Sequence, residues 1–507
     1  MMKKTMAGLL CLVFASSGYA TNYTRDAGDT SWSNLGQWND NSGGSYANST
    51  VMPGASDTVL LNGGKVLTVD SNVVIGTIVL PNATSDATLQ LTNNFSLTAS
   101  TILVGHDTQA GGHGLLTHSD GTIDSGSVTV RAKGTGTGTY NLSDTAVLNA
   151  TTFTMGSVNA TAGAGTGEST MNQSGGTATL TTANLGGIGN SFYNMTGGTL
   201  SGATLNVGNA HALAAGTTTM EHSAGVVSSA TVNVGGTGTS SYNLSGSGAL
   251  SPATAINVGA TAGKAGALNQ SGGTASTSAL NVGTDGAYNL TGGTLTTTGT
   301  AVTVNGQLDI NGGTWTIEQD LANVTIDGNG LLTLQSGTLE TTGTDPTDLL
   351  LVKTDIEVSG GTMNLIGQAR LNAELKILGD AATISLARLG SAGGGTANFI
   401  FDDTGVSTVN VSAWMTLDDL DLIVDGSAYT GSETSFVLLD AVNNTASLKS
   451  YTVTGFGTEG VDWELVQTLG SGNSADVVLN IIPEPATLGL IAAFGGGMLF
   501  IRRRFMM

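Results

Sequence analysis

The chain has 507 residues, of which 76 are glycine and only 10% are charged, and its formal net charge is −22. A surface with this acidic balance repels phosphate backbones, which argues against nucleic-acid binding. Apolar residues make up 39% of the chain and the glycines recur periodically, so regular turns fit the composition better than a disordered linker.

Residues 1–20 have the pattern of a secretory signal peptide. Lys3 and Lys4 precede an apolar core, and a small-x-small site ends at Ala20, so we expect cleavage between Ala20 and Thr21. The single cysteine, Cys11, lies in this segment, and the mature chain is therefore expected to have no disulfide.

Residues 21–54 contain two tryptophans, Trp32 and Trp38, and are predicted to form an N-terminal cap. The first coil of a repeat array exposes an apolar end, which bulky aromatic side chains can close. A sugar-stacking surface is the alternative.

Three histidines, His106, His113 and His118, follow in a glycine-rich stretch. Their spacing matches no standard zinc pattern, so we interpret this stretch as a solvated loop and predict neither a metal nor a cofactor.

Residues 140–362 form a degenerate repeat. One word ends in Gly-Gly-Thr, as in NQSGGT at 172–177 and 269–274, and a second word is Asn-Val-Gly. The second word recurs about every 24 residues, at Asn206, Asn233, Asn257 and Asn281. A period of this length, with Thr- and Val-rich runs between glycine turns, predicts an all-β fold: a right-handed parallel β-solenoid over 55–390. A β-propeller is the structural alternative.

The recurring asparagines lie at one register of the expected coils. Stacking would place their amides above one another, where they can hydrogen-bond along the solenoid axis.

The sequence pattern changes after a glycine-rich hinge at 391–395, because the later strand-like runs lack the Gly-Gly-Thr word. We therefore predict a separate β-sandwich-like domain over 396–480. The carboxylates of Asp418, Asp419, Asp421 and Asp425 suggest a calcium site. Because the segment mostly alternates between polar and apolar residues, we interpret it instead as an edge strand.

The last residues, 483–507, have the most specific pattern in the chain. Pro483, Glu484 and Pro485 precede a short apolar run over 486–501, which ends at Arg502, Arg503 and Arg504. The run is predicted to be a marginal transmembrane helix, and the arginines a membrane stop that leaves the bulk of the chain outside.

This tail resembles the PEP-CTERM sorting signal of Gram-negative bacterial surface proteins. The resemblance implies recognition by an exosortase, removal of the helix near Pro483–Pro485, and delivery to the cell surface or the exopolysaccharide matrix. The repeats also resemble those of autotransporter passengers, although the chain ends in a helix and arginines where those proteins end in a β-barrel.

We therefore expect a non-catalytic surface or matrix protein that contacts glycans. Asn-x-Ser/Thr sequons recur, but such triplets arise by chance in this composition; they begin at Asn82, Asn141, Asn194, Asn243 and Asn289. The rival is a β-helix polysaccharide lyase or glycoside hydrolase, which needs converging carboxylates or a basic residue beside a carboxylate. The repeat offers few basic residues, and its carboxylates form no recognisable pair.

Overall fold

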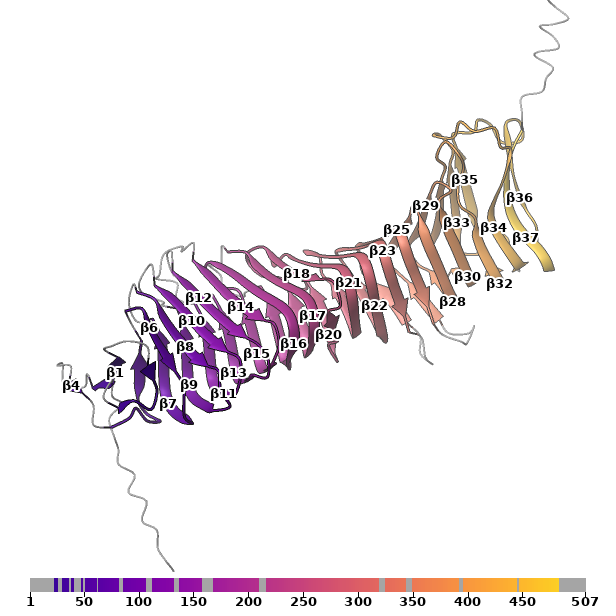
Figure 1. Ribbon diagram of the computed structural model, residues 1–507. Helices are drawn as coiled ribbons and strands as arrows, with labels where there is room; N and C mark the ends of the chain where they lie inside the picture. Colours follow the sequence, from indigo (N-terminus) through magenta and orange to yellow (C-terminus); the bar gives the residue numbers. More distant parts are fainter. Residues whose placement is uncertain are drawn as a thin grey trace, which may run out of the picture.

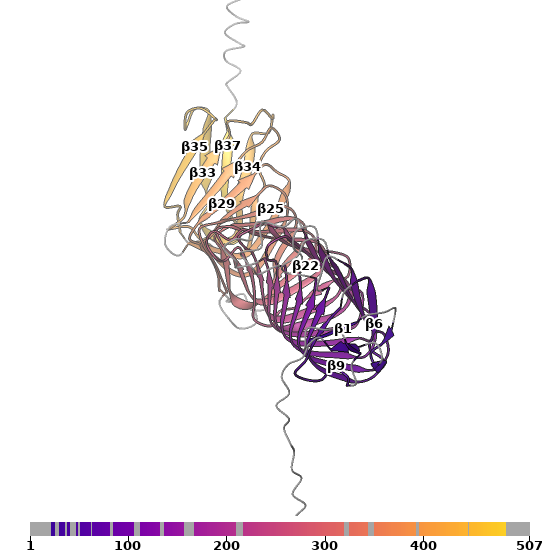
Figure 2. The same ribbon diagram turned by 90° about the vertical axis from the view of Figure 1, so that its left-hand side faces the viewer.

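The computed structural model describes residues 22–482, except 26–29, 36–37, 41–46, 49–50, 62, 82–84, 106–111, 132–135, 157–166, 209–215, 319–323, 343–348, 392–394 and 445. The named elements of this part are all strands, and they stack into an elongated rod (Figure 1). The chain runs steadily from one end of the rod to the other, as Figure 2 shows from the N-terminal end.

Each turn of the rod contains three strand segments. In one turn, β10 (His113–His118) is followed by β11 (Thr122–Val130), which bends at Gly126 and so supplies two segments. β10 pairs in parallel with β8 (Ala87–Leu91) and β12 (Thr137–Leu142). β11 pairs in parallel with β9 (Ser96–Val104) and β13 (Val147–Met155). The fold is therefore a parallel β-solenoid, as predicted, and the propeller alternative is wrong.

Three parallel sheets follow from this stacking. The first sheet contains, in order, β2 (Thr30–Ser31), β6 (Lys65–Thr68), β8, β10, β12, β14 (Glu168–Gln173), the starts of β16 (Asn190–Val207) and β17 (Thr218–Val234), β18 (Ser240–Leu244), the starts of β21 (Gly266–Val282), β22 (Gly286–Val304), β23 (Gln307–Ile317) and β25 (Leu331–Thr341), and then β27 (Asp355–Val358), β29 (Glu374–Leu378), β31 (Thr396–Ile400), β33 (Asp421–Asp425) and β35 (Ser450–Thr454).

The second and third sheets are supplied by the longer strands that bend between them. They contain β7 (Val73–Leu80), β9, β11, β13, β15 (Thr177–Leu185), the later parts of β16, β17, β21, β22, β23 and β25, the short strands β19 (Ala249–Leu250), β20 (Ala255–Val258), β24 (Val324–Asp327) and β26 (Leu349–Val352), and then β28 (Gly361–Leu371), β30 (Ala382–Ser391), β32 (Val409–Thr416) and β34 (Ser435–Asn444).

The core is a narrow column inside the three sheets. Alternate residues of each strand point inward, as in β8, where Ala87, Leu89 and Leu91 are buried and the residues between them are partly exposed. Because a solenoid turn contacts only its two neighbours, this column suffices for stability although the chain is rich in small residues. Full burial of one such leucine contributes about 1.5–3 kcal/mol.

The Gly-Gly-Thr word forms the corner between the first and second sheets. Gly176 and Gly198 have φ values of 63° and 77°, a left-handed conformation that glycine adopts at little cost. A Cβ on Gly198 would also collide with the carbonyl oxygens of Gly175 and Gly176 in the preceding turn. The word therefore marks a corner where successive turns touch backbone to backbone.

The predicted asparagine ladder is confirmed. Along the third sheet, each Nδ2 donates to the Oδ1 of the asparagine one turn earlier, over 2.7–2.8 Å. The ladder consists of Asn184, Asn206, Asn233, Asn257 and Asn281.

Both tryptophans of the expected N-terminal cap are buried. Trp32 and Trp38 are 2% and 0% exposed, their ring centroids lie 5.1 Å apart, and Trp38 Nε1 donates to Trp32 O over 3.0 Å. Such buried rings cannot serve as a sugar-stacking surface. The strand β1 (Asn22–Arg25) pairs in parallel with β5 (Thr58–Leu60) and antiparallel with β3 (Trp38–Asp40), which pairs with β4 (Ala47–Asn48).

The prediction of a separate domain over 396–480 is wrong. The ladders continue in parallel across its expected boundary, from β29 through β31 and β33 to β35, and from β30 through β32 to β34. Among the described strands after β31, β37 (Gly470–Ile481) alone reverses direction, being antiparallel to both β34 and β36 (Trp463–Gln467). Inward alternation persists here, at Ala397 and Phe399 for example, while the turns lose the glycine word that marks the earlier coils.

Aromatic side chains close this end as well. Phe401 lies in edge contact with Phe436 and Phe456, with centroids 4.8 and 5.2 Å apart, and Tyr429 joins the cluster. Among the described residues no helix is long and apolar enough to cross a membrane. The segment expected to do so, 486–501, lies outside them.

Candidate functional sites

The residues of the predicted processing signals lie outside the part of the chain that the structure describes. This holds for Ala20 and Thr21 at the expected signal cleavage site. It holds equally for the tail residues Pro483, Glu484, Pro485, Arg502, Arg503 and Arg504. These assignments stay predictions.

The interpretation of the histidine stretch as a solvated loop is wrong for two of its three members. His113 and His118 are the first and last residues of β10, and His118 is completely buried. The exposed His113 contacts Thr137 Oγ1 through Nδ1 over 2.7 Å, whereas His106 lies outside the described residues. Within the described chain, no group of three His, Cys, Asp or Glu side chains is arranged to hold a metal.

His118 belongs to a buried polar motif that the sequence analysis missed. Its Nδ1 lies 2.9 Å from the hydroxyl of Tyr140, one turn further along, and its Nε2 lies 3.2 Å from Gly121 O. His222 repeats this arrangement with Tyr242 at 2.8 Å and Gly225 O at 3.1 Å.

At the equivalent position further along the chain, glutamine alternates with histidine from one occurrence of the motif to the next. The hydroxyl of Tyr193 donates to Gln173 Oε1, and that of Tyr288 donates to Gln270 Oε1, each over 2.6 Å. The Nε2 atoms of the two glutamines donate to the carbonyl oxygens of Thr199 and Thr294 over 3.0 and 2.9 Å. Each position thus needs one acceptor facing the tyrosine and one donor facing a corner carbonyl.

This requirement fixes the state of the two histidines. A carbonyl oxygen can only accept, so Nε2 carries the proton, and the neutral ring then accepts from the tyrosine hydroxyl at Nδ1. Burial lowers the pKa of His118 to about 4 and also lowers that of His222, against smaller opposing effects of the bonds to Gly121 and Gly225. The motif is a structural site in which neutral histidine and glutamine are equivalent.

A second asparagine ladder on the first sheet explains the recurrent sequons. The Nδ2 atoms of Asn194 and Asn289 donate to Asn172 and Asn269 of the preceding turns, and that of Asn243 donates to Glu221. The asparagine faces outward, the next residue faces the core, and the Ser or Thr begins the corner, so the triplet follows from the turn geometry. The chance interpretation is therefore wrong for these sequons, while Asn82 lies outside the described residues.

Asp418 and Asp419 lie in a turn, whereas Asp421 and Asp425 are the first and last residues of β33, a strand inside a sheet. β33 pairs with β31 on one side and with β35 on the other, so the edge-strand interpretation is wrong. Asp421 contacts Lys449 Nζ over 2.9 Å, and Asp425 Oδ1 accepts from Ser427 N over 3.0 Å. The hydrogen bond from the Ser450 hydroxyl, and after it the Lys449 ammonium, lower the pKa of Asp421, and the hydrogen bonds from Ser427 lower that of Asp425.

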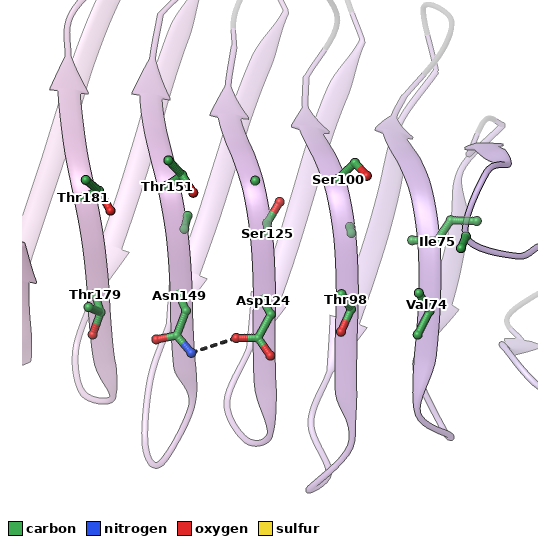
Figure 3. Close-up of a pocket in the computed structure, with 14 residues that line it drawn as sticks. Val74, Ile75, Thr98, Ser100, Asp124, Ser125, Asn149, Thr151, Thr179 and Thr181 are labelled. Carbon is green, nitrogen blue, oxygen red and sulfur yellow. Dashed lines mark hydrogen bonds between the residues drawn. The ribbon is translucent and has the colours of Figure 1, made fainter.

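A shallow groove of about 800 Å³ runs across β7, β9, β11, β13 and β15 where these strands bend. Figure 3 shows two rows of side chains along it. One row passes through Thr98, Asp124, Asn149 and Thr179. The other contains Ser100, Thr151 and Thr181, with Gly126 in register between Ser100 and Thr151. Parallel register brings Thr98, Asp124 and Asn149 side by side in successive turns. Sequence reasoning missed this groove because its side chains differ from strand to strand and belong to neither of the two recurring words.

The strands β34 and β37 bring together two carboxyl groups, Asp440 and Asp476, which lie opposite each other in register. The pKa of Asp476 is raised, first by burial and then by the charge of Asp440 and the hydrogen bond to it. Burial and the neighbouring carboxyl group thus both favour the protonated form of Asp476.

No family model, curated protein or solved structure matches this chain.

Proposed function

We propose that this chain is an exported, non-catalytic cell-surface or extracellular-matrix protein whose solenoid is a rigid spacer with an adhesive polar face. The observation that carries this proposal is the continuous parallel ladder, closed by buried aromatic side chains at both ends. Every turn is hydrogen-bonded to its neighbours in three sheets, so the rod resists bending and its length is set by the number of turns.

The tail completes the proposal. The last described strand, β37, ends at Ile481, two residues before Pro483. A PEP-CTERM segment that includes a membrane helix over 486–501 and a stop at Arg502, Arg503 and Arg504 would thus leave from one end of the rod. An exosortase would process it near Pro483–Pro485, and the N-terminal end, after cleavage between Ala20 and Thr21, would project away from a Gram-negative inner membrane.

Mass spectrometry of the native protein tests the sorting proposal. We expect the mature N-terminus at Thr21, no peptide beyond the Pro483–Pro485 region, and recovery from the surface or matrix fraction. Deletion of 483–507 should abolish surface retention. An intact arginine-tipped tail in a cell-interior fraction would contradict sorting without affecting the fold.

A polysaccharide lyase or hydrolase is the second candidate, and the pair of Asp440 and Asp476 is the observation in its favour. A carboxyl group with a raised pKa beside an ionised one supplies an acid and a base. Glycoside hydrolysis, however, needs carboxyl groups about 5–10 Å apart with room for the sugar between them, whereas Asp440 and Asp476 are direct neighbours on adjacent strands. We therefore prefer the spacer.

Incubation of the purified solenoid with neutral and acidic polysaccharides separates the two candidates. We expect no change in chain length, measured by size-exclusion chromatography. Cleavage that Asp476→Asn abolishes would establish the enzyme instead.

A further inference from the structure

The groove across β7 to β15 differs chemically from the rest of the outer face. Its two rows are built almost entirely from hydroxyl and amide side chains, and its floor contains small residues such as Ala99, Gly126 and Ala150. Its lining also includes Ala55 and Val74, and Val74 is 56% exposed. The lining thus combines many hydrogen-bonding groups with a few apolar contacts.

The groups repeat with the solenoid. Asp124 lies in register with Thr98 and Asn149, and Asn149 with Thr179. Neighbouring strands are about 4.8 Å apart, so the row from Thr98 to Thr179 offers a polar group at that interval on four successive strands. One ring of an extended polysaccharide is about as long as this step, and a chain laid along the axis would therefore meet the same contacts ring after ring.

The charge of the groove selects among polysaccharides. The described residues that line it include no lysine, arginine or histidine. Its one carboxylate, Asp124, accepts a hydrogen bond from Asn149 Nδ2 over 2.8 Å, as the dashed line in Figure 3 marks. A uronic acid or sulfated chain would find no cation in this lining and would face a protein with a formal net charge of −22.

We infer that this groove binds a linear neutral polysaccharide strand parallel to the solenoid axis, with about one sugar ring per turn. The inference rests on the proposed adhesive function and names its ligand class and its site. Ser100, Thr151 and Thr181 form one rail of hydrogen-bonding groups, and Thr98 and Asn149 belong to the other.

The test measures binding of linear neutral hexose oligomers of increasing length to the full mature chain by calorimetry. Because the groove crosses five turns, affinity should rise with length to about five rings and then level off. Oligomers of a uronic acid with the same linkage should bind at least tenfold more weakly.

Two variants locate the site. Thr151→Trp should fill the groove and reduce affinity at least tenfold, whereas the matched control Thr139→Trp, on the outer face of β12, should leave it unchanged. Should the tryptophan disturb folding, Thr98→Val together with Thr179→Val removes two hydroxyl groups at constant volume and should reduce affinity severalfold.

Each other outcome has a distinct meaning. Neutral oligomers that bind the wild type and both tryptophan variants equally would overturn the groove as the site and leave the adhesive function standing. Equal binding of acidic oligomers would overturn the ligand class. A complete lack of glycan binding by a protein that is still sorted to the surface would overturn the inference and the adhesive part of the function, but not the spacer.

Discussion

His118, Gln173, His222 and Gln270 occupy one position of the turn, and they share one task. Each satisfies the hydroxyl of a tyrosine that is fully buried in the next turn. A buried hydroxyl without a partner costs about 1–3 kcal/mol, so the tyrosine and its partner occur together. The tyrosine recurs in every second turn, so the tyrosine and its partner have a period of two turns.

The two histidine positions predict a pH dependence that the glutamine positions lack. The pKa of His118 is about 4 in the folded protein against an ordinary 6.5. Its contribution to stability is therefore complete above pH 6.5 and is lost as the pH falls toward 4, by about 2 kcal/mol at pH 5. Hydrogen exchange of β10 and β12 should accelerate accordingly between pH 7 and pH 5, after correction for the intrinsic rate.

His118→Gln is the control, because the chain itself uses glutamine at this position. The variant should fold at pH 7 and lose the extra exchange at pH 5 in β10 and β12. A wild type and variant with the same pH dependence would show that another group titrates there; the nearest charged side chain is Asp120.

At the scale of the element, the corner glycines serve both conformation and stacking. Gly198 has a φ of 77° and touches the preceding turn. Gly263 has a φ of 73°, and apart from its chain neighbours no described heavy atom lies within 4 Å of the place that an alanine methyl group would take. The two glycines thus share a backbone conformation and differ in their surroundings.

Gly198→Ala should consequently lower the free energy of unfolding more than Gly263→Ala does. The left-handed conformation costs alanine about 1–2 kcal/mol at either site, and the collision with backbone carbonyls at Gly198 should add at least about 2 kcal/mol. Guanidinium unfolding of both variants measures the difference. Equal losses would mean that conformation alone selects glycine at the corner.

The asparagine ladder of the third sheet offers a similar comparison. Asn257 donates to Asn233 and accepts from Asn281, each over 2.7 Å, while Asn281 ends the ladder. Each hydrogen bond contributes about 1 kcal/mol to stability. In the same assay, Asn257→Ala should therefore lower the free energy of unfolding by about 2 kcal/mol, and Asn281→Ala should lower it by about half as much. The ladder would contribute nothing if both variants matched the wild type.

At the scale of the whole molecule, sequence reasoning succeeded where a signal recurs once in every turn. The glycine words and the outward asparagines have one period and one role, so the coil and the asparagine ladder could be predicted from them. The cap was predicted separately, from the two tryptophans. The histidine–tyrosine pairs were missed because their polar member changes between histidine and glutamine, so no single residue type recurs at that position. His118 was compared with nearby histidines although Gln173 and Gln270 precede the same corner.

The C-terminal error has a related cause. Beyond residue 390 the corners lose the Gly-Gly-Thr word, but Leu422 and Val424 still point inward and β33 still pairs in parallel on both sides. A change of turn chemistry was mistaken for a change of fold. The handedness of the coil stays a prediction.

Distances between spin labels test the continuous ladder most directly. Thr139, Ala287 and Leu331 lie in one row of the first sheet, linked turn by turn through parallel registers. Cysteine labels at Thr139 and Ala287 should be about 29 Å apart, and labels at Thr139 and Leu331 about 38 Å apart, because six and eight strand spacings separate them. Narrow distributions that lengthen by about 10 Å between the two pairs would support a single rigid solenoid, whereas broad distributions or a distance that fails to grow with the number of turns would contradict it.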